Sequence, residues 1–127
     1  MFEHQKEART FRVLMGQPTD SFNPETARLQ QHLISEEYGE FLEAHCESLT
    51  YIQNKRAREH ALKELTDLAY VCYQYAAAAG WDLDEALTRV HESNLSKLDD
   101  DLRPIKREDG KVMKGPNYKP ANLIDLV

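Results

Sequence analysis

"ISEEYGEFLEAHCE", residues 34–47, carries five glutamates in a segment whose apolar spacing predicts a helix. Residues three or four apart share one face of a helix, because each residue turns the chain by about 100°. Glu37 falls at the centre of the apolar stripe of this helix, and Glu40 lies about 60° from it on the same side. The apolar members of the stripe are Leu29, Leu33, Phe41 and Ala44. Two acids therefore occupy positions where the pattern favours leucine or isoleucine, which is typical of a functional site.

The other three glutamates of this stretch have an ordinary interpretation. Glu36, Glu43 and Glu47 fall together on the flank of the helix, where charged side chains are expected to face water. Only the two acids on the stripe need a further explanation.

A second helix repeats the anomaly in "ELTD", residues 64–67. Glu64 lies at the centre of an apolar side and Asp67 about 60° away from it. The apolar residues of that side are Ala61, Leu68, Val71, Cys72 and Tyr75. One buried acid is explained by a cap or an ion pair, but two such pairs are harder to explain in that way. If the helices pack stripe to stripe, four carboxylates converge.

Converging carboxylates need a compensating cation, or some of them must take up protons. Two such charges about 4 Å apart repel each other by about 4 kcal/mol at an effective dielectric near 20. Ligation by oxygen alone favours Mg²⁺, with Mn²⁺ as a substitute, and Ca²⁺ stays open although the sequence has no EF-hand loop. A di-iron bundle is disfavoured, because no histidine has a glutamate three residues before it.

Length and composition indicate a folded protein of ordinary type. The 127 residues suffice for one domain, and 41% hydrophobic with 30% charged residues is not a disordered composition. A net charge of −6 argues against nucleic acid or an acidic membrane as a partner. With neither a membrane-spanning run nor a signal segment in the sequence, we expect a cytoplasmic protein. Cys46 and Cys72 are expected to be reduced thiols in the core.

The pattern along the chain predicts an all-α fold, a four-helix-type bundle with an extended C-terminal tail. Asn23 is the expected N-cap of the second helix, Gly80 the end of the third and Asp82 the N-cap of the fourth. We expect a single domain, 1–127, completed by dimerisation because the third helix is apolar almost all round. The expected helices are residues 3–15, 24–48, 57–79 and 83–98, followed by the tail at about 99–127.

The fourth helix carries cations near its C-terminal end. Asn94 and Lys97 continue the face defined by Leu83, Leu87 and Val90. Taken alone, this is a stripe that frays into water, where lysine extends its charge. Beside a carboxylate–metal site, the same residues favour a polyphosphate ligand, which needs further cations. The tail downstream supplies Lys111, Lys114, Tyr118 and Lys119.

These motifs together resemble a known family. "EEYGE", followed after 23 intervening residues by "ELTD", is similar to the EExxE…ExxD motif of the all-α nucleoside triphosphate pyrophosphatases. That superfamily includes MazG-like proteins, dimeric dUTPases and phosphoribosyl-ATP pyrophosphohydrolases. "NLSK" resembles its NxxK element, and "DGKVMKGPNYKP" is similar to the tail of a MazG-like subgroup labelled phosphoribosyl-ATP pyrophosphohydrolase-like. The resemblance covers roughly residues 25–120.

The resemblance implies Mg²⁺-dependent hydrolysis of a nucleoside triphosphate, usually a deoxynucleotide, to the monophosphate and pyrophosphate. It also implies a homodimer or a dimer of dimers, and a role in nucleotide-pool housecleaning. Glu36 would orient or deprotonate the attacking water. The metal ligands would be Glu37, Glu40, Glu64 and Asp67. The phosphate contacts would be Asn94, Lys97, Lys114 and Tyr118.

Other interpretations remain open at this point. Within the same chemistry, the alternative is a true phosphoribosyl-ATP pyrophosphohydrolase of histidine biosynthesis. In another class, the chain is a nucleotide- or metal-binding regulatory bundle without catalysis, for which Glu36 would have no use. In a third, it is a helical scaffold whose acids face water. The sequence does not identify the base, although Gln17 and Phe22 are candidates for its pocket.

Overall fold

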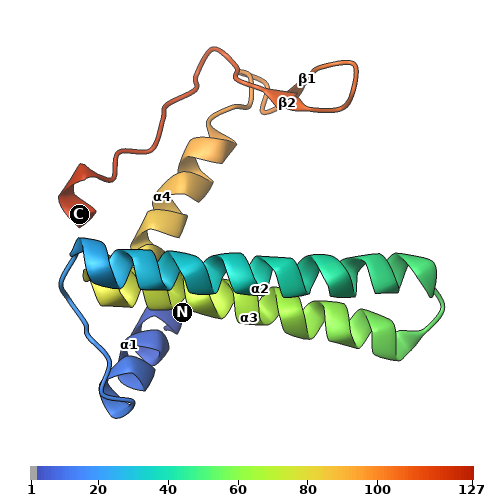
Figure 1. Cartoon of the computed structure of the whole chain (residues 1–127). Coiled ribbons are helices and arrows are strands. Elements are labelled where there is room, and N and C mark those ends of the chain that lie inside the picture. The colour runs from blue at the N-terminus through green and yellow to red at the C-terminus, as the bar shows by residue number, and fades with distance from the viewer. Residues whose placement is uncertain (1–2) are drawn as a thin grey trace. The chain divides into compact units, whose positions relative to one another are not determined.

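The computed structural model describes residues 3–127, which contain four α-helices and one two-stranded antiparallel sheet (Figure 1). The all-α prediction is therefore confirmed. The chain divides into two compact units, of which the first ends at Trp81 and the second begins at Asp82. The prediction of a single domain over the whole chain stays a prediction. In chain order the helices are α1 (His4–Leu14), α2 (Pro24–Thr50), α3 (Lys55–Ala79) and α4 (Leu83–Leu95).

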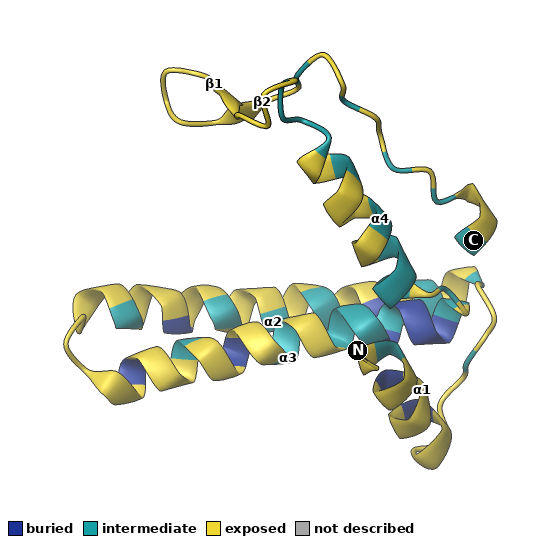
Figure 2. Cartoon of the chain, turned by 180° about the vertical axis from the view of Figure 1, so that it is seen from behind, coloured by how far each residue is buried: buried dark blue, intermediate teal, exposed yellow. Residues whose placement is uncertain are grey.

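The first unit is built on a long helical pair. α2 and α3 run side by side in opposite directions, joined by a short turn, and α1 packs against α3 (Figure 1). Buried residues occur along both long helices (Figure 2), and those of α3 also contact α1, since the Gln74 amide donates to the Ala8 carbonyl at 3.3 Å. The pairing of α2 with α3 is what brings the two predicted acidic motifs, one on each helix, to the same interface.

The ends of the long helices follow from local hydrogen-bonding chemistry. The Asn23 side chain accepts a hydrogen bond from the Thr26 N–H at 2.9 Å, and Pro24 opens α2, as expected. Gly80 ends α3 in the left-handed conformation, with φ of 82°. A side chain at Gly80 would also clash, because its Cβ would lie 2.9 Å from the Asp20 Cα. Glycine therefore fits both the turn and the close approach of the α1–α2 linker.

The apolar part of the first unit's interior is made of small side chains. Among residues 3–127, the apolar residues that are buried are all alanines, namely Ala8, Ala44, Ala57, Ala76, Ala77 and Ala78. The largest fully buried side chain is Arg12, which donates to the Pro18 carbonyl at 2.7 Å and to the Gln74 amide oxygen at 3.3 Å. Large apolar side chains, among them Leu62 and Leu65, stay exposed. The described chain has no large apolar core of its own.

The second unit consists of α4 and the segment that follows it. Asp82 caps α4 by accepting a hydrogen bond from the Glu85 N–H at 3.0 Å, as expected. The helix ends at Leu95, earlier than predicted, and Lys97 lies in the turn that follows. The segment then forms a short hairpin closed by a turn at Gly110. The hairpin strands are β1 (Ile105–Lys106) and β2 (Val112–Met113), and the 3-10 helix η1 (Ile124–Leu126) lies near the C-terminus.

Two further expectations from the sequence are wrong. Cys46 is exposed rather than part of the core, although both cysteines are free thiols as expected. Leu87 and Val90, which were expected on the inner face of α4, are exposed as well. Both errors have one cause: periodicity identifies an apolar face but does not say whether the same chain covers it. Within residues 3–127, no helix has the length and apolarity needed to cross a membrane.

Candidate functional site

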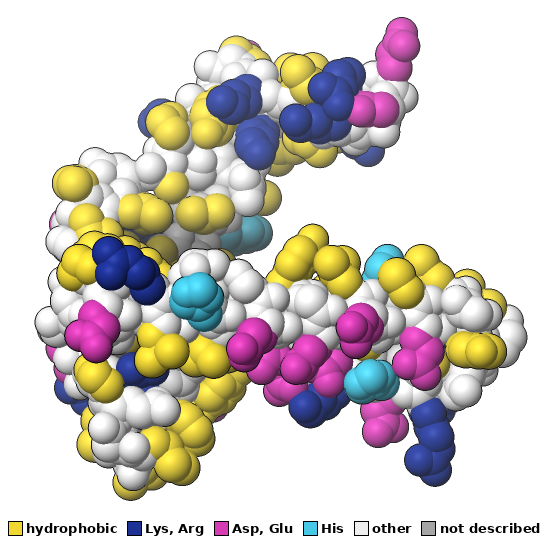
Figure 3. All heavy atoms as spheres, viewed as in Figure 1, with side chains coloured by type: hydrophobic (Ala, Val, Ile, Leu, Met, Phe, Trp, Pro, Cys, Tyr) yellow, Lys and Arg dark blue, Asp and Glu magenta, His cyan; other side chains and the backbone are white. Residues whose placement is uncertain are grey.

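The two acidic motifs meet at the interface between α2 and α3. Carboxylate oxygens of Glu37 and Glu40 from α2 and of Glu64 from α3 all lie within 4.8 Å of one another. Figure 3 shows acidic side chains gathered along the middle of the helical pair. The helical spacing explains the convergence, because each motif places an acid on the face that its helix turns toward the other. We call Glu37, Glu40, Glu64 and Asp67 the acidic cluster.

Two oxygens of the cluster are buried without a hydrogen-bond partner. These are Oε2 of Glu37 and Oε2 of Glu64, both cut off from solvent. A buried carboxylate oxygen with no donor is costly, and a divalent cation removes that cost by direct ligation. Oxygen ligands whose negative charge has no partner therefore fit a hard divalent cation such as Mg²⁺ or Mn²⁺.

The electrostatics at Glu37 point the same way. Burial raises the pKa of Glu37 above its ordinary value, and nearby negative charges raise the pKa further. The acids responsible are Glu40, Asp67 and Glu64. A bound cation would offset the repulsion between these carboxylates and so favour the charged form of Glu37.

Asp67, the fourth predicted ligand, is paired with a lysine. Lys63 Nζ lies 2.5 Å from Asp67 Oδ2 and 3.9 Å from Glu64 Oε1. Three of the four predicted ligands thus share one small volume, whereas Asp67 stands beside them with its charge already matched. Sequence reasoning overlooked Lys63, although its i, i+4 spacing from Asp67 is a recognisable signal.

A histidine also contacts the cluster. His60 Nε2 lies 3.2 Å from Glu64 Oε1, one turn along α3, and His60 Nδ1 lies 3.7 Å from Glu47 Oε2 on α2. The sequence reasoning did not include His60 in the site. Its i, i+4 spacing from Glu64 was again the available signal.

The remaining glutamates of α2 lie where the helical pattern placed them. Glu36 and Glu43 are both exposed, as expected of residues on the flank. Glu36 neighbours the cluster in sequence and is open to water, which suits a residue that acts on a water molecule. Its catalytic role stays a prediction.

An open cleft of about 300 Å³ adjoins the acidic cluster in the first unit, and Glu37 and Asp67 form part of its wall. Aromatic, aliphatic and amide side chains line the rest, together with Arg12. The Phe11 and Tyr70 rings meet edge to face with centroids 5.9 Å apart. The amides are Gln17, Gln30 and Gln74. Flat apolar surface combined with a few amide groups is the usual lining of a small-molecule pocket.

Of the two residues considered for base binding, only one lies at this cleft. Gln17 lines the cleft together with Glu37. Phe22 instead stacks on Trp81, with ring centroids 5.1 Å apart. Gln30 was not foreseen as part of a site, yet it is buried and its Oε1 has no hydrogen-bond partner.

The predicted phosphate-binding residues all belong to the second unit. Lys114 Nζ lies 4.8 Å from the centroid of the Tyr118 ring, a cation–π contact. The backbone at Gly115 packs so closely on the turn after α4 that a Cβ there would lie 2.5 Å from the Lys97 carbonyl oxygen. The structure thus brings Lys97, Lys114 and Tyr118 into one part of this unit, with Asn94 exposed on α4.

Comparison with known proteins supports the interpretation of the acidic motifs. Residues 8–94 match the family described as phosphoribosyl-ATP pyrophosphohydrolase. The match takes in every residue of the acidic cluster and Asn94, whereas Lys97, Lys114 and Tyr118 lie beyond it. A search of curated proteins finds no match. Because the matched segment spans more than half of the chain, the protein belongs to the phosphoribosyl-ATP pyrophosphohydrolase family, hydrolases that act on phosphoanhydride bonds.

Proposed function

We propose that this protein is a Mg²⁺-dependent pyrophosphohydrolase that cleaves its substrate between the α- and β-phosphates and releases pyrophosphate. The observation that supports this proposal most is the convergence of Glu37, Glu40 and Glu64, with two carboxylate oxygens left without a partner. Burying carboxylate oxygens without a partner destabilises the fold, and a scaffold that binds no cation would gain nothing in return. The family, in addition, is one of hydrolases.

The substrate proposed first is phosphoribosyl-ATP, because the family match carries that description. The sequence motifs alone favour an ordinary or deoxy nucleoside triphosphate over phosphoribosyl-ATP. The family match therefore reverses the order of these two candidate substrates. A nucleoside triphosphate remains the second candidate for one specific reason. The matched segment ends at residue 94, and the tail that resembles the MazG-like subgroup lies outside it.

In the proposed mechanism, the acidic cluster holds Mg²⁺, which would polarise the phosphate and acidify a bound water. Glu37, Glu40 and Glu64 would hold the ion, and Asp67 would be a fourth ligand in place of its pairing with Lys63. Glu36 accepts the proton of the attacking water. Glu36 is exposed on the flank of α2, so a water molecule can reach its carboxylate.

Cations of the second unit are proposed to bind the phosphates. Lys97 and Lys114 would offset charge on the departing pyrophosphate, and Asn94 and Tyr118 would donate hydrogen bonds to phosphate oxygens. The contact between Lys114 and the Tyr118 ring supports this role, because it limits the positions that the ammonium group can take.

The cleft beside the acidic cluster is proposed to receive the nucleoside. Gln17 and Gln30 offer amide groups for the edge of a base, and Phe11 and Tyr70 offer apolar surface. The unpartnered Oε1 of Gln30 supports a ligand that donates a hydrogen bond, such as the amino group of adenine or cytosine.

A second copy of the chain is proposed to complete the fold. Because only alanines are buried among the apolar residues of 3–127, the first unit leaves large apolar side chains uncovered. Leu62 and Leu65 on α3 are 63% and 47% exposed. A helical face of this kind is stable in water when a partner covers it.

The function is tested by incubating the protein with phosphoribosyl-ATP and with a panel of ribo- and deoxynucleoside triphosphates, with and without Mg²⁺. We expect a monophosphate product and pyrophosphate, formed only with the metal present. Formation of a diphosphate and phosphate would refute the proposed bond, and no turnover of any substrate would refute the enzyme. The ratio of kcat/KM between phosphoribosyl-ATP and the best triphosphate decides the substrate.

A further inference from the structure

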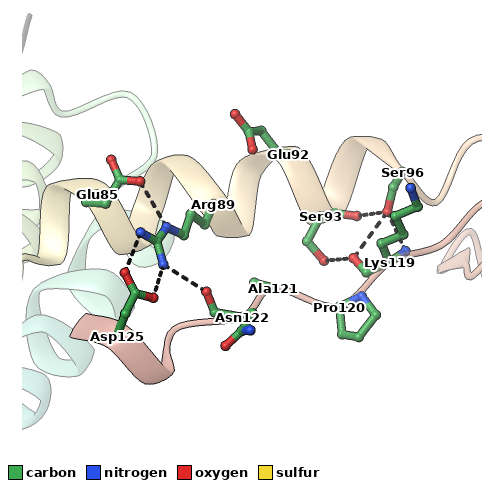
Figure 4. A pocket seen from close by; sticks show the side chains of 10 residues that line it. All are labelled: Glu85, Arg89, Glu92, Ser93, Ser96, Lys119, Pro120, Ala121, Asn122 and Asp125. Carbon is green, nitrogen blue, oxygen red and sulfur yellow. Dashed lines mark hydrogen bonds and ion pairs between the residues drawn. The ribbon is translucent and has the colours of Figure 1, made fainter. Parts of the chain in front are cut away.

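The C-terminal residues of the chain lie along α4 and are tied to it at successive turns. We call residues 119–126 the strap. Arg89 on α4 forms a two-pronged ion pair with Asp125, at 2.6 Å and 3.0 Å, and also donates to the Asn122 carbonyl at 3.0 Å (Figure 4). Glu85, one turn earlier, accepts from Arg89 Nε at 2.9 Å and so fixes the guanidinium from behind.

Two serines tie the other end of the strap. Ser93 donates to the Lys119 carbonyl at 2.7 Å, and the Lys119 N–H donates to the Ser96 hydroxyl at 2.9 Å (Figure 4). Helical spacing puts the residues that hold the strap on one side of α4. The strap is therefore bound along its length by a polar stripe, of which Arg89 makes the most contacts.

The strap begins directly after the segment predicted to bind phosphate. Tyr118 precedes Lys119 in the chain, and its N–H donates to the Gly115 carbonyl at 3.2 Å. Within the same segment, the Asn117 amide donates to Asp100 at 2.7 Å. The strap thus anchors residues 114–118 at their C-terminal end, with Lys114 against the Tyr118 ring.

The strap leaves the predicted phosphate-binding side of α4 free. Asn94 lies about 140° around the helix from Arg89. The guanidinium of Arg89 is also satisfied by Glu85, Asp125 and a carbonyl, so it has little capacity left for a substrate anion. We therefore assign Arg89 the role of binding the strap rather than the substrate.

We propose that the Arg89–Asp125 clasp is a positioning device that holds Lys114 and Tyr118 ready for phosphate, an inference that rests on the proposed function. A lysine on an ordered segment binds an anion at a smaller cost in conformational entropy than one on a free tail. Loss of the clasp therefore weakens substrate binding, and raises KM, without removing any group that takes part in the chemistry.

The clasp is tested with Arg89→Ala and Asp125→Asn. The two substitutions change the net charge in opposite directions but break the same contact. Both are expected to raise KM about tenfold and to leave kcat within about threefold. Arg89→Lys, which keeps the charge but not the fork, is expected to fall between Arg89→Ala and the wild type. The matched control is Arg107→Ala, because Arg107 pairs locally with Asp109 in the hairpin.

Trypsin cleavage after Lys114 gives a readout that needs no activity. We expect Arg89→Ala and Asp125→Asn to be cut about tenfold faster there than the wild type, and Arg107→Ala to be unchanged. A wild-type chain that is inactive on every substrate would end the proposed function, whereas the cleavage rate would still report the clasp. The two failures are therefore distinguishable.

A combined substitution shows whether Arg89 acts through Lys114 and Tyr118. In a background that carries Lys114→Ala and Tyr118→Phe, adding Arg89→Ala is expected to raise KM no further, because both phosphate-binding groups that the clasp positions are already gone. Additive effects would overturn the proposal. So would KM values that move in opposite directions in Arg89→Ala and Asp125→Asn, since that would show a general effect of charge. The proposal would also be overturned if trypsin cut Arg89→Ala and Asp125→Asn after Lys114 no faster than the wild type. The same holds if both variants lost kcat together with their helical circular dichroism signal.

Discussion

Lys63 Nζ lies 2.5 Å from the carboxylate of Asp67, one turn further along α3, so a predicted metal ligand is paired with a cation of the chain itself. Asp67 and Glu64 raise the pKa of Lys63, with the hydrogen bond to Asp67 as the largest cause. The ammonium group thus partly neutralises the acidic cluster. A metal ion that takes Asp67 as a ligand must first displace this lysine.

We expect Lys63→Met to bind Mg²⁺ more tightly than the wild type, because the competing cation is removed. Exposed ion pairs contribute little individually, so the expected gain is about two- to fivefold in Kd. Calorimetric titration with Mg²⁺ measures it. Lys55→Met, on the same helix but at its exposed start, is the control and should bind as the wild type does. Weaker binding in Lys63→Met would mean that the lysine supports the site.

Removing single charges from the acidic cluster should abolish turnover and leave the fold intact. We expect Glu37→Gln and Asp67→Asn each to lower kcat about a hundredfold or more, because each removes a ligand for the ion that stabilises the reacting phosphate. Pyrophosphate release measures turnover, and circular dichroism checks the helices. Glu43→Gln, on the exposed flank of α2, should keep its activity. Near-normal Mg²⁺-dependent turnover in both variants would refute the assignment of ligands.

The raised pKa of Glu37 predicts how the metal-free protein responds to pH. The folded state holds this proton more tightly than the unfolded state, whose value is near 4.5. The resulting stabilisation is fully present below that pH and is lost as pH rises through the higher folded pKa. Urea unfolding in the presence of a chelator should therefore show a falling free energy of unfolding over this range.

Two comparisons test that cause. Glu37→Gln cannot ionise, so its stability should fall less over the same pH range. Mg²⁺ should also reduce the fall in the wild type, because the ion favours the charged form of the cluster. Parallel profiles for the wild type and Glu37→Gln would show that another group is responsible.

Periodicity was sufficient to predict the centre of the candidate site. Glu37 and Glu64 sit on apolar stripes, and in a pair of packed helices such stripes face each other, so their meeting followed from the sequence. The caps were equally local: Asn23 and Gly80 act on backbone groups within a few residues of themselves. The caps depend on one helix at a time, whereas the meeting of the two acids also required the two stripes to pack together, as α2 and α3 do.

What the sequence could not supply are contacts between distant segments. Arg89 and Asp125 are thirty-six positions apart, and no periodicity links a helix to an irregular tail. The hairpin was missed because strands of two residues, such as Ile105–Lys106, carry no alternating pattern. The exposure of Leu87 was missed for another reason. Periodicity shows that a helix has an apolar face but not that another part of the same chain covers it.

The exposed leucines of α3 predict that the chain associates with itself. We expect the wild type to sediment as a dimer or a larger even assembly at micromolar concentration, and its melting temperature to rise with concentration. Leu62→Asp combined with Leu65→Asp should shift it toward the monomer, because charges at the centre of an apolar interface lose their hydration without a partner. Lys55→Asp changes the net charge by the same amount at an exposed position and should leave assembly unchanged. A wild type that sediments as a monomer, with a melting temperature independent of concentration, would show that the single chain is stable without covering these residues.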